Sequence, residues 1–115
     1  MKIPETIRIG GVDYAVNYED NVILDNNLCY GAINYEESVI SLSNTRGAGY
    51  QYRCITLWHE ILHGIRNHAG LEIKNEEAVV DMFAKGIYQV LQDNGRALFD
   101  LKEHTDNGQV NIQVT

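Results

Sequence analysis

Residues 50–67 read YQYRCITLWHEILHGIRN, and this stretch carries the clearest helix pattern in the chain together with its most informative motif. Apolar side chains recur here at helical spacing, which predicts a helix over the whole stretch. They form one stripe, Cys54, Trp58, Ile61 and Ile65, which is widened by Ile55, Leu57 and Leu62. We therefore expect a helix that is buried on most sides and ends at Gly70, a residue suited to the left-handed conformation after a last helical turn.

Within this helix, residues 59–63 read HEILH, two histidines four positions apart with a glutamate directly after the first. Four residues make slightly more than one helical turn, so His59 and His63 project from the same face and can bind one metal ion between them. Glu60 lies to the side of that pair, where its carboxylate can act as a general base without being a ligand. The motif predicts a zinc site with the chemistry of peptide hydrolysis.

A catalytic zinc takes three protein ligands, so the two histidines need a partner. The best candidates are Glu76 and Glu77, which open a second predicted helix over residues 75–93. We prefer Glu77, and we expect Asp81, on the same helix face, to accept a hydrogen bond from the free ring nitrogen of a liganding histidine. Acidic residues in a first helical turn are also favoured by the helix dipole without any metal, so one of the two glutamates is expected to serve that purpose.

The second helix and the residues after it carry weaker signals. Its predicted core face comprises Val80, Phe83, Ile87, Val90 and Leu91. Asn75 is a suitable residue to cap its start, and Asn94-Gly95 is expected to end it. Residues 97–101 fit a short helical piece. The alternating Val110, Ile112 and Val114 lie in a polar tail that is expected to fray beyond about residue 103.

The first half of the chain alternates in the manner of strands. Strands are predicted near residues 5–9 and 12–18 around the Gly10-Gly11 turn, and a second pair over residues 29–35 and 39–42. The predicted fold class is α+β, with a small antiparallel sheet packed against the metal-binding helix and a second long helix. The strand over 39–42 is either a plain structural strand or a sheet edge beside the cleft, where an extended substrate could add to it.

The composition limits the classes of protein to consider. At 115 residues, with 44% hydrophobic and 22% charged residues, the chain is expected to fold as one domain over residues 1–115. A net charge of -7 without a Lys/Arg cluster argues against direct binding of nucleic acid or of an anionic membrane. Apolar runs long enough for a secretion signal or a membrane helix are missing, and Cys29 and Cys54 stand far apart, so we expect a soluble cytoplasmic protein with reduced thiols.

Over roughly residues 28–92 the chain resembles the short glutamate-zincin metallopeptidases of the ImmA/IrrE kind, found in phages, prophages and mobile elements. The resemblance rests on a small sheet, on HEILHGI, and on E-x-x-x-D-x-F-A formed by Glu77, Asp81, Phe83 and Ala84. It implies a minimal zincin-like fold in which His59, His63 and Glu77 hold Zn2+ and Glu60 is the base. It also implies a protein substrate, such as a repressor or regulator, in the cytoplasm of a host cell if the chain is phage-encoded.

Two other classes of function remain open from the sequence. One is a catalytically silent, zinc-stabilised binding module that docks to a phage or host protein. The other is a metal-free structural domain in which the histidines belong to the core. Zinc peptidases often add a donor that meets the developing oxyanion, and the candidates here are Tyr50, Tyr52, Arg66, His68, Tyr88 and His104.

Overall fold

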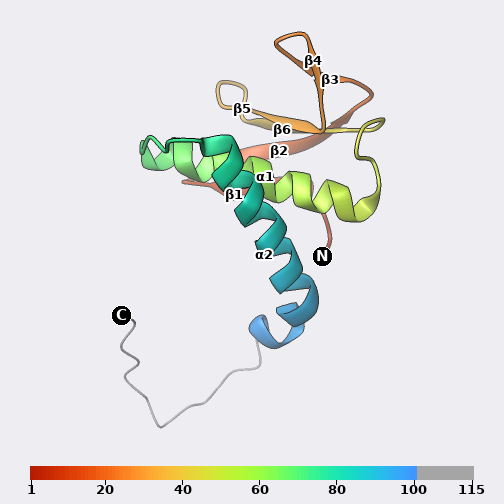
Figure 1. Ribbon diagram of the computed structural model, residues 1–115, viewed down its shortest axis with the longest axis vertical. Coiled ribbons are helices and arrows are strands. Elements are labelled where there is room, and N and C mark those ends of the chain that lie inside the picture. Colours follow the sequence, from red (N-terminus) through yellow and green to blue (C-terminus); the bar gives the residue numbers. More distant parts are fainter. Residues whose placement is uncertain (101–115) are drawn as a thin grey trace.

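Six strands precede two helices in the part of the chain that the structure, a computed structural model, describes, residues 1–100 (Figure 1). The strands are β1 (Thr6–Ile9), β2 (Val12–Glu19), β3 (Val22–Leu24), β4 (Asn27–Cys29), β5 (Gly31–Asn34) and β6 (Val39–Ser43), and the helices are α1 (Tyr50–Ala69) and α2 (Glu76–Leu98). The predicted α+β class is confirmed. Neither helix in residues 1–100 is long and apolar enough to cross a membrane.

The main sheet is mixed, so the prediction of an antiparallel sheet is wrong. Its strand order is β1-β2-β6-β5, with antiparallel pairs at both ends and a parallel pair between β2 and β6 in the middle. Parallel neighbours need a long connection, and residues 20–38 provide it. The strand over 39–42 therefore lies inside the sheet, and β5 rather than β6 is an edge.

The connection between β2 and β5 contains a small hairpin that the sequence analysis missed. Strands β3 and β4 pair with each other in a separate two-stranded sheet, which projects from the main sheet in Figure 1. Asp25 and Asn26 form its turn with φ angles of 51° and 63°. Asp and Asn tolerate this left-handed conformation better than most residues, which suits a tight hairpin turn. The predicted strand over 29–35 is thereby divided, with β4 ending at Cys29 and β5 starting at Gly31.

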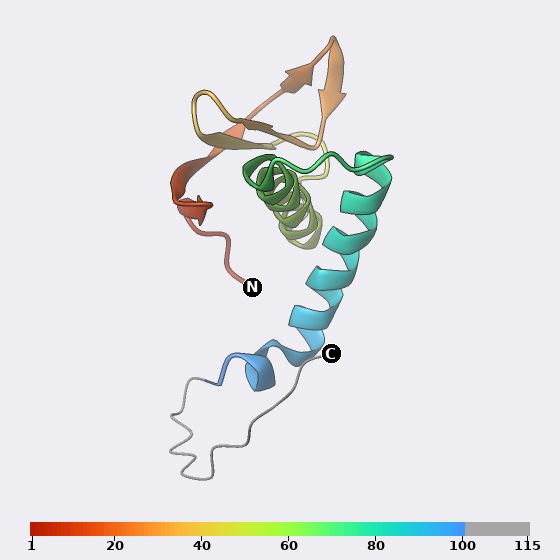
Figure 2. The same cartoon turned by 90° about the vertical axis from the view of Figure 1, so that its left-hand side faces the viewer.

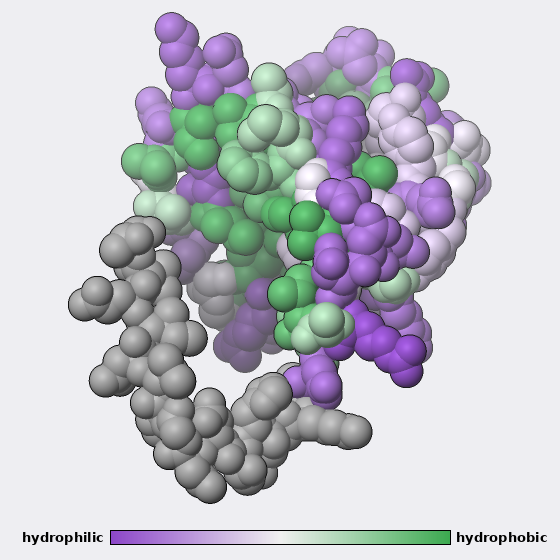
Figure 3. Space-filling model, turned by 60° about the horizontal axis from the view of Figure 1, so that its bottom comes forward, coloured by the Kyte–Doolittle hydropathy of each residue, from purple (hydrophilic) through white to green (hydrophobic). Residues whose placement is uncertain are grey.

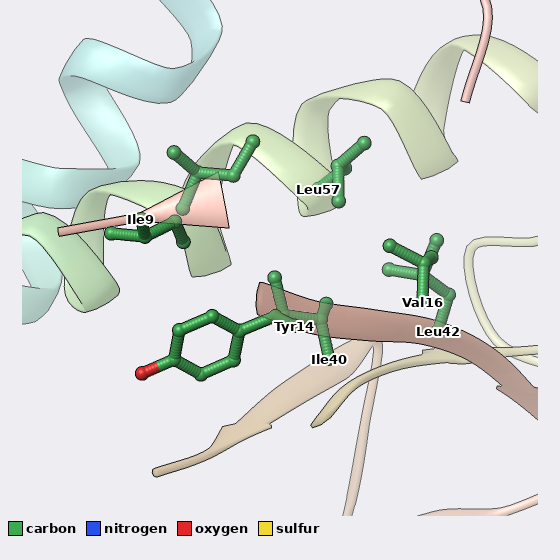
Figure 4. Close-up of a cluster of buried hydrophobic side chains, with 7 residues drawn as sticks. Ile9, Tyr14, Val16, Ile40, Leu42 and Leu57 are labelled. Atoms are coloured by element: carbon green, nitrogen blue, oxygen red, sulfur yellow. The ribbon is translucent and has the colours of Figure 1, made fainter. Parts of the chain in front are cut away.

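Helix α1 lies across one face of the main sheet, and the core forms between them (Figure 2, Figure 4). This core comprises Ile9, Tyr14, Val16, Ile40, Leu42, Leu57 and Ile61. The contact is close at Gly64, because an added Cβ there would lie 3.0 Å from Ile9 Cδ1 and 3.1 Å from Ile33 Cδ1. The predicted end of the helix is confirmed, since Gly70 has φ 68° and its N–H bonds to the carbonyls of Arg66 and Asn67. Ile65, expected in the stripe, is 49% exposed.

Helix α2 packs against α1 rather than against the sheet (Figure 2). Its buried residues are Val80, Ala84 and Tyr88. Phe83 is 52% and Val90 is 43% exposed, so the prediction that these two residues belong to the core face is wrong. A helix with one packing partner buries only a narrow stripe of its side chains. Hydrophobic side chains accordingly gather on one face of the molecule, as Figure 3 shows.

The ends of α2 also differ from the prediction. Asn75 precedes the helix in a left-handed conformation and makes no side-chain capping bond. The helix passes through Asn94-Gly95 and ends at Leu98, because Gly95 keeps a negative φ and does not take the left-handed conformation that stops a helix. The proposed helical piece over 97–101 therefore begins inside α2, and the predictions for Leu101, His104, Val110, Ile112 and Val114 lie outside the described residues.

Candidate metal centre

The structure brings His59, His63 and Glu77 together at the crossing of α1 and α2, with one ligand atom of each within 4.8 Å of the others. The Nε2 atoms of the two histidines are 3.1 Å apart. Glu77 Oε1 lies 2.8 Å from His63 Nε2, and Glu77 Oε2 lies 3.2 Å from His59 Nε2. Ligands about 2.0–2.1 Å from a tetrahedral zinc are roughly 3.3 Å apart, so the three side chains have nearly the spacing that such an ion requires.

Local structure explains how these atoms converge. One turn of α1 separates the two histidines, whose rings meet edge to face with centroids 4.8 Å apart. Glu77 stands in the first turn of α2, after a connection in which Asn75 has a φ of 59°. The histidine side chains are 18% and 11% exposed and that of Glu77 is 78% exposed, so the centre is closed by protein on the α1 side and open to solvent beside Glu77.

The hydrogen bond at His63 Nδ1 determines which of the two ring nitrogens carries the proton. His63 Nδ1 lies 2.6 Å from Glu76 Oε2, and an ionised carboxylate only accepts hydrogen bonds, so the Nδ1 proton is donated to Glu76. In neutral imidazole the other nitrogen is then a bare acceptor. In that neutral form His63 Nε2 directs a lone pair at Glu77 Oε1, 2.8 Å away, an arrangement that a bound cation relieves.

The two consecutive glutamates thus have different places. Glu77 lies at the Nε2 atoms, as preferred from the sequence, and Glu76 lies at the far side of the His63 ring. Hydrogen bonding to His63 is the main cause that lowers the pKa of Glu76; partial burial opposes it, and Arg66 adds to it. Asp81 Oδ1 is 3.7 Å from His59 Nδ1, too far for a hydrogen bond, and Asp81 Oδ2 pairs with Lys85 Nζ at 2.7 Å. Glu76, rather than Asp81, is the carboxylate that lies within hydrogen-bonding distance of a histidine Nδ1 atom, and that histidine is His63.

Glu60 lies beside this group and is buried, with 7% of its surface exposed. Burial is the largest cause that raises the pKa of Glu60 from 4.5 to about 7; the neighbouring His63 lowers it, and Glu77 raises it. A carboxyl group with a pKa near neutrality can both take up and release a proton under ordinary conditions. Glu60 has the properties that a general base needs.

The proposed oxyanion donors are dispersed. The Tyr50 hydroxyl donates to the Met1 carbonyl, the Tyr52 ring packs on Tyr30 at 5.0 Å, and Tyr88 is buried in α2. His68 packs against the turn at Gly10, where an added Cβ would lie 2.2 Å from the ring. Arg66 pairs with Glu76, and His104 lies outside the described residues.

Tyr35 is a residue near the centre that the sequence analysis passed over. Its hydroxyl donates to the His63 carbonyl at 3.2 Å. Burial raises the pKa of Tyr35, the charge of Arg66 and a hydrogen bond with Arg66 lower it, and Glu76 and Glu60 raise it. Tyr35 therefore lies close to the charged groups Arg66, Glu76 and Glu60. It follows the end of β5 directly, and only the packing of that edge strand on α1 brings it there.

Comparisons with protein-family models, with curated proteins and with solved structures give no match.

Proposed function

We propose that the chain is a zinc-dependent metallopeptidase that hydrolyses peptide bonds in a protein substrate. The observation that carries this proposal is the convergence of three metal-binding side chains, His59, His63 and Glu77, with a buried glutamate beside them. Two imidazole nitrogens and one carboxylate oxygen are a typical ligand set of catalytic zinc, in which a fourth position stays open to water or substrate. The solvent-exposed side of Glu77 is consistent with such an opening.

In this proposal the protein's own residues move the proton. Zinc in such a site supplies the Lewis acidity that activates a water molecule and polarises a substrate carbonyl. The Glu60 carboxylate takes the proton of that water and later delivers it to the leaving nitrogen, so one group acts as base and then as acid. Its pKa of about 7 suits both steps at neutral pH. Its burial keeps bulk water from competing for the proton.

The resemblance to ImmA/IrrE-like glutamate-zincins supplies the more specific part of the proposal. It suggests a minimal zincin-like fold and a substrate that is a repressor or regulator protein of a phage or mobile element. The order of a small sheet, a helix with HEILH and a second helix with Glu77 and Asp81 supports it. The sequence-based expectation of a cytoplasmic location belongs to the same proposal.

Metal analysis of the purified protein tests the centre. We expect one zinc per wild-type chain and its loss in His63→Ala. His68→Ala is the matched control, because His68 stands on the same helix but packs on the turn at Gly10. A wild-type protein that neither retains nor takes up zinc would contradict the proposal.

Cleavage of candidate protein substrates tests the chemistry. Glu60→Gln should keep zinc and lower the rate by at least the roughly 100-fold to 10,000-fold that general base catalysis contributes. The same variant can capture the uncleaved substrate for identification. Full proteolysis by Glu60→Gln would show that Glu60 is not the base.

A catalytically silent, zinc-stabilised binding module is the second candidate function. An apolar groove of about 240 Å³ between the end of α1 and the start of α2 favours it. Among the groove's lining residues are Leu62, Ile65, Leu71 and Phe83, the last three of them about half exposed or more. Exposed apolar surface of this kind is typical of docking sites. Stoichiometric zinc without turnover of any tested protein would favour this alternative over the peptidase.

A further inference from the structure

Arg66 lies outside the metal ligands but next to the group that orients one of them. Its Nε is 2.9 Å from Glu76 Oε1, while the other oxygen of Glu76 is 2.6 Å from His63 Nδ1. The buried Arg66 Nε makes no aligned hydrogen bond within residues 1–100, so the contact with Glu76 is chiefly one of opposite charges. Arg66, Glu76 and His63 therefore form a chain that ends on the ring of a metal-binding histidine.

A second contact connects Arg66 with the same histidine. The Tyr35 hydroxyl donates to the His63 carbonyl at 3.2 Å, and Arg66 lies near enough to Tyr35 that its charge and hydrogen bonding lower the pKa of that hydroxyl. A hydroxyl oxygen can accept one hydrogen bond while its proton is donated elsewhere, so both contacts are compatible. One guanidinium thus touches both groups that hold His63, one at its ring and one at its backbone.

We propose that Arg66 is a positioning residue, which holds Glu76 against His63 Nδ1 so that His63 Nε2 is left unprotonated and directed at the metal position. This inference rests on the proposed metal centre and adds a residue to which neither the HEILH motif nor the resemblance assigns this role. The side chains of Arg66 and Glu76 are only 22% and 24% exposed, whereas that of Glu77 is 78% exposed. Glu76 is accordingly the glutamate that the protein holds in place.

The need for such a device follows from the sequence. Glu76 and Glu77 are adjacent, chemically identical carboxylates at the start of one helix, and either could turn towards a cation. Arg66 offers Glu76 a positive partner on the far side of the His63 ring and so leaves Glu77 to the metal. Without Arg66, Glu76 is free to leave His63 Nδ1, and the imidazole can take the tautomer with its proton on Nε2, in which the nitrogen that faces His59 and Glu77 has no lone pair for the metal.

Zinc affinity, measured by competition with a chelator on the full chain, tests the proposal. Loss of a group that orients a metal ligand lowers affinity roughly 10-fold to 100-fold, and we expect a loss of this order in Arg66→Gln. Arg66→Lys keeps the charge and should recover part of the loss. Arg53→Gln is the matched control, because Arg53 stands on the same helix but contacts Ser43, Asn44 and Tyr18. Its zinc affinity should equal that of the wild type.

Two spectroscopic measurements separate positioning from a purely structural ion pair between the helices. The visible spectrum of the Co2+-substituted protein should change in Arg66→Gln and not in Arg53→Gln. In the metal-free protein, 15N NMR should show His63 with its proton on Nδ1 in the wild type and a mixture of tautomers in Arg66→Gln.

The outcomes are distinguishable. If Arg66→Gln unfolds more easily but keeps wild-type zinc affinity and the wild-type Co2+ spectrum, the ion pair is structural and the inference is overturned. If the wild type binds no zinc, the proposed function fails, and the tautomer of His63 in the metal-free protein still decides the role of Arg66. If Arg66→Gln does not fold, Arg66→Lys provides the comparison: a partial loss of zinc affinity supports the inference, and wild-type affinity together with the wild-type Co2+ spectrum overturns it.

Discussion

Replacing Glu60 with Gln should make the metal-free protein more stable at high pH relative to the wild type. Glu60 is 7% exposed, and burial raises its pKa from 4.5 to about 7. In the unfolded chain the group is expected to titrate near its ordinary value. Between these two pH values the unfolded wild type releases a proton that the folded state retains. The stabilisation from protonated Glu60 is therefore complete below about pH 4.5 and is lost as pH rises through about 7.

The size of the effect follows from the same pKa. A change from 4.5 to about 7, at about 1.4 kcal/mol per pKa unit, corresponds to about 3 kcal/mol. Domains of this size are usually stable by about 5–15 kcal/mol in total, so the wild type should lose a large part of its stability on going from pH 5 to pH 8. Gln has nearly the same shape and carries no charge, so its contribution to the free energy of unfolding should not depend on pH.

Urea unfolding at intervals from pH 5 to pH 8, with a chelator present, measures how the free energy of unfolding depends on pH. The difference between the unfolding free energies of Glu60→Gln and wild type should grow in favour of the variant by about 3 kcal/mol over that range. Taking the difference removes the contributions of groups that do not interact with Glu60. Glu72→Gln, at an exposed position in the connection between the helices, should show no such growth. A constant difference for Glu60→Gln would refute the buried, proton-holding carboxyl on which the general base assignment depends.

Three further predictions concern the helices. Gly64→Ala should destabilise the protein by about 1 kcal/mol or more in denaturant unfolding, because the added Cβ meets two isoleucines of the sheet at 3.0 and 3.1 Å. Gly86→Ala, with open space at its Cβ, should stabilise it by about 0.5–1 kcal/mol, and effects of the same sign in both would contradict the close packing of α1 on the sheet. Leu57→Ala, at a fully buried position, should lower the unfolding free energy by about 2–5 kcal/mol, and a loss below 1 kcal/mol would place Leu57 outside the core. Added zinc should raise the melting temperature of the wild type and of His68→Ala but not of His63→Ala, and an equal rise in all three would indicate binding elsewhere.

The parts of the fold that could be predicted are those set by nearby residues. The alternation in β1 and β2, the helix around HEILH and the stop at Gly70 depend on local conformation and were identified correctly. The parallel pairing of β2 with β6 was not, because alternation is the same in parallel and antiparallel strands. For α2, apolar residues occupy more than one face, and only the position of α1 decides that Ala84 is buried and Phe83 exposed.

The candidate site shows the same division between local and distant information. Helical spacing alone puts His59 and His63 on one face, and it does so in any protein that forms this helix. The distribution of tasks between Glu76 and Glu77 depends on the crossing of two helices, which no local pattern encodes. Neighbouring helical positions point about 100° apart, so α2 can present one carboxylate to the Nε2 atoms and the other to the opposite side of the His63 ring. Arg66, one turn after His63, meets that second carboxylate. Under the proposed function, the adjacent acidic pair divides into one metal-facing group and one orienting group because Arg66 of α1 places a positive charge beside Glu76.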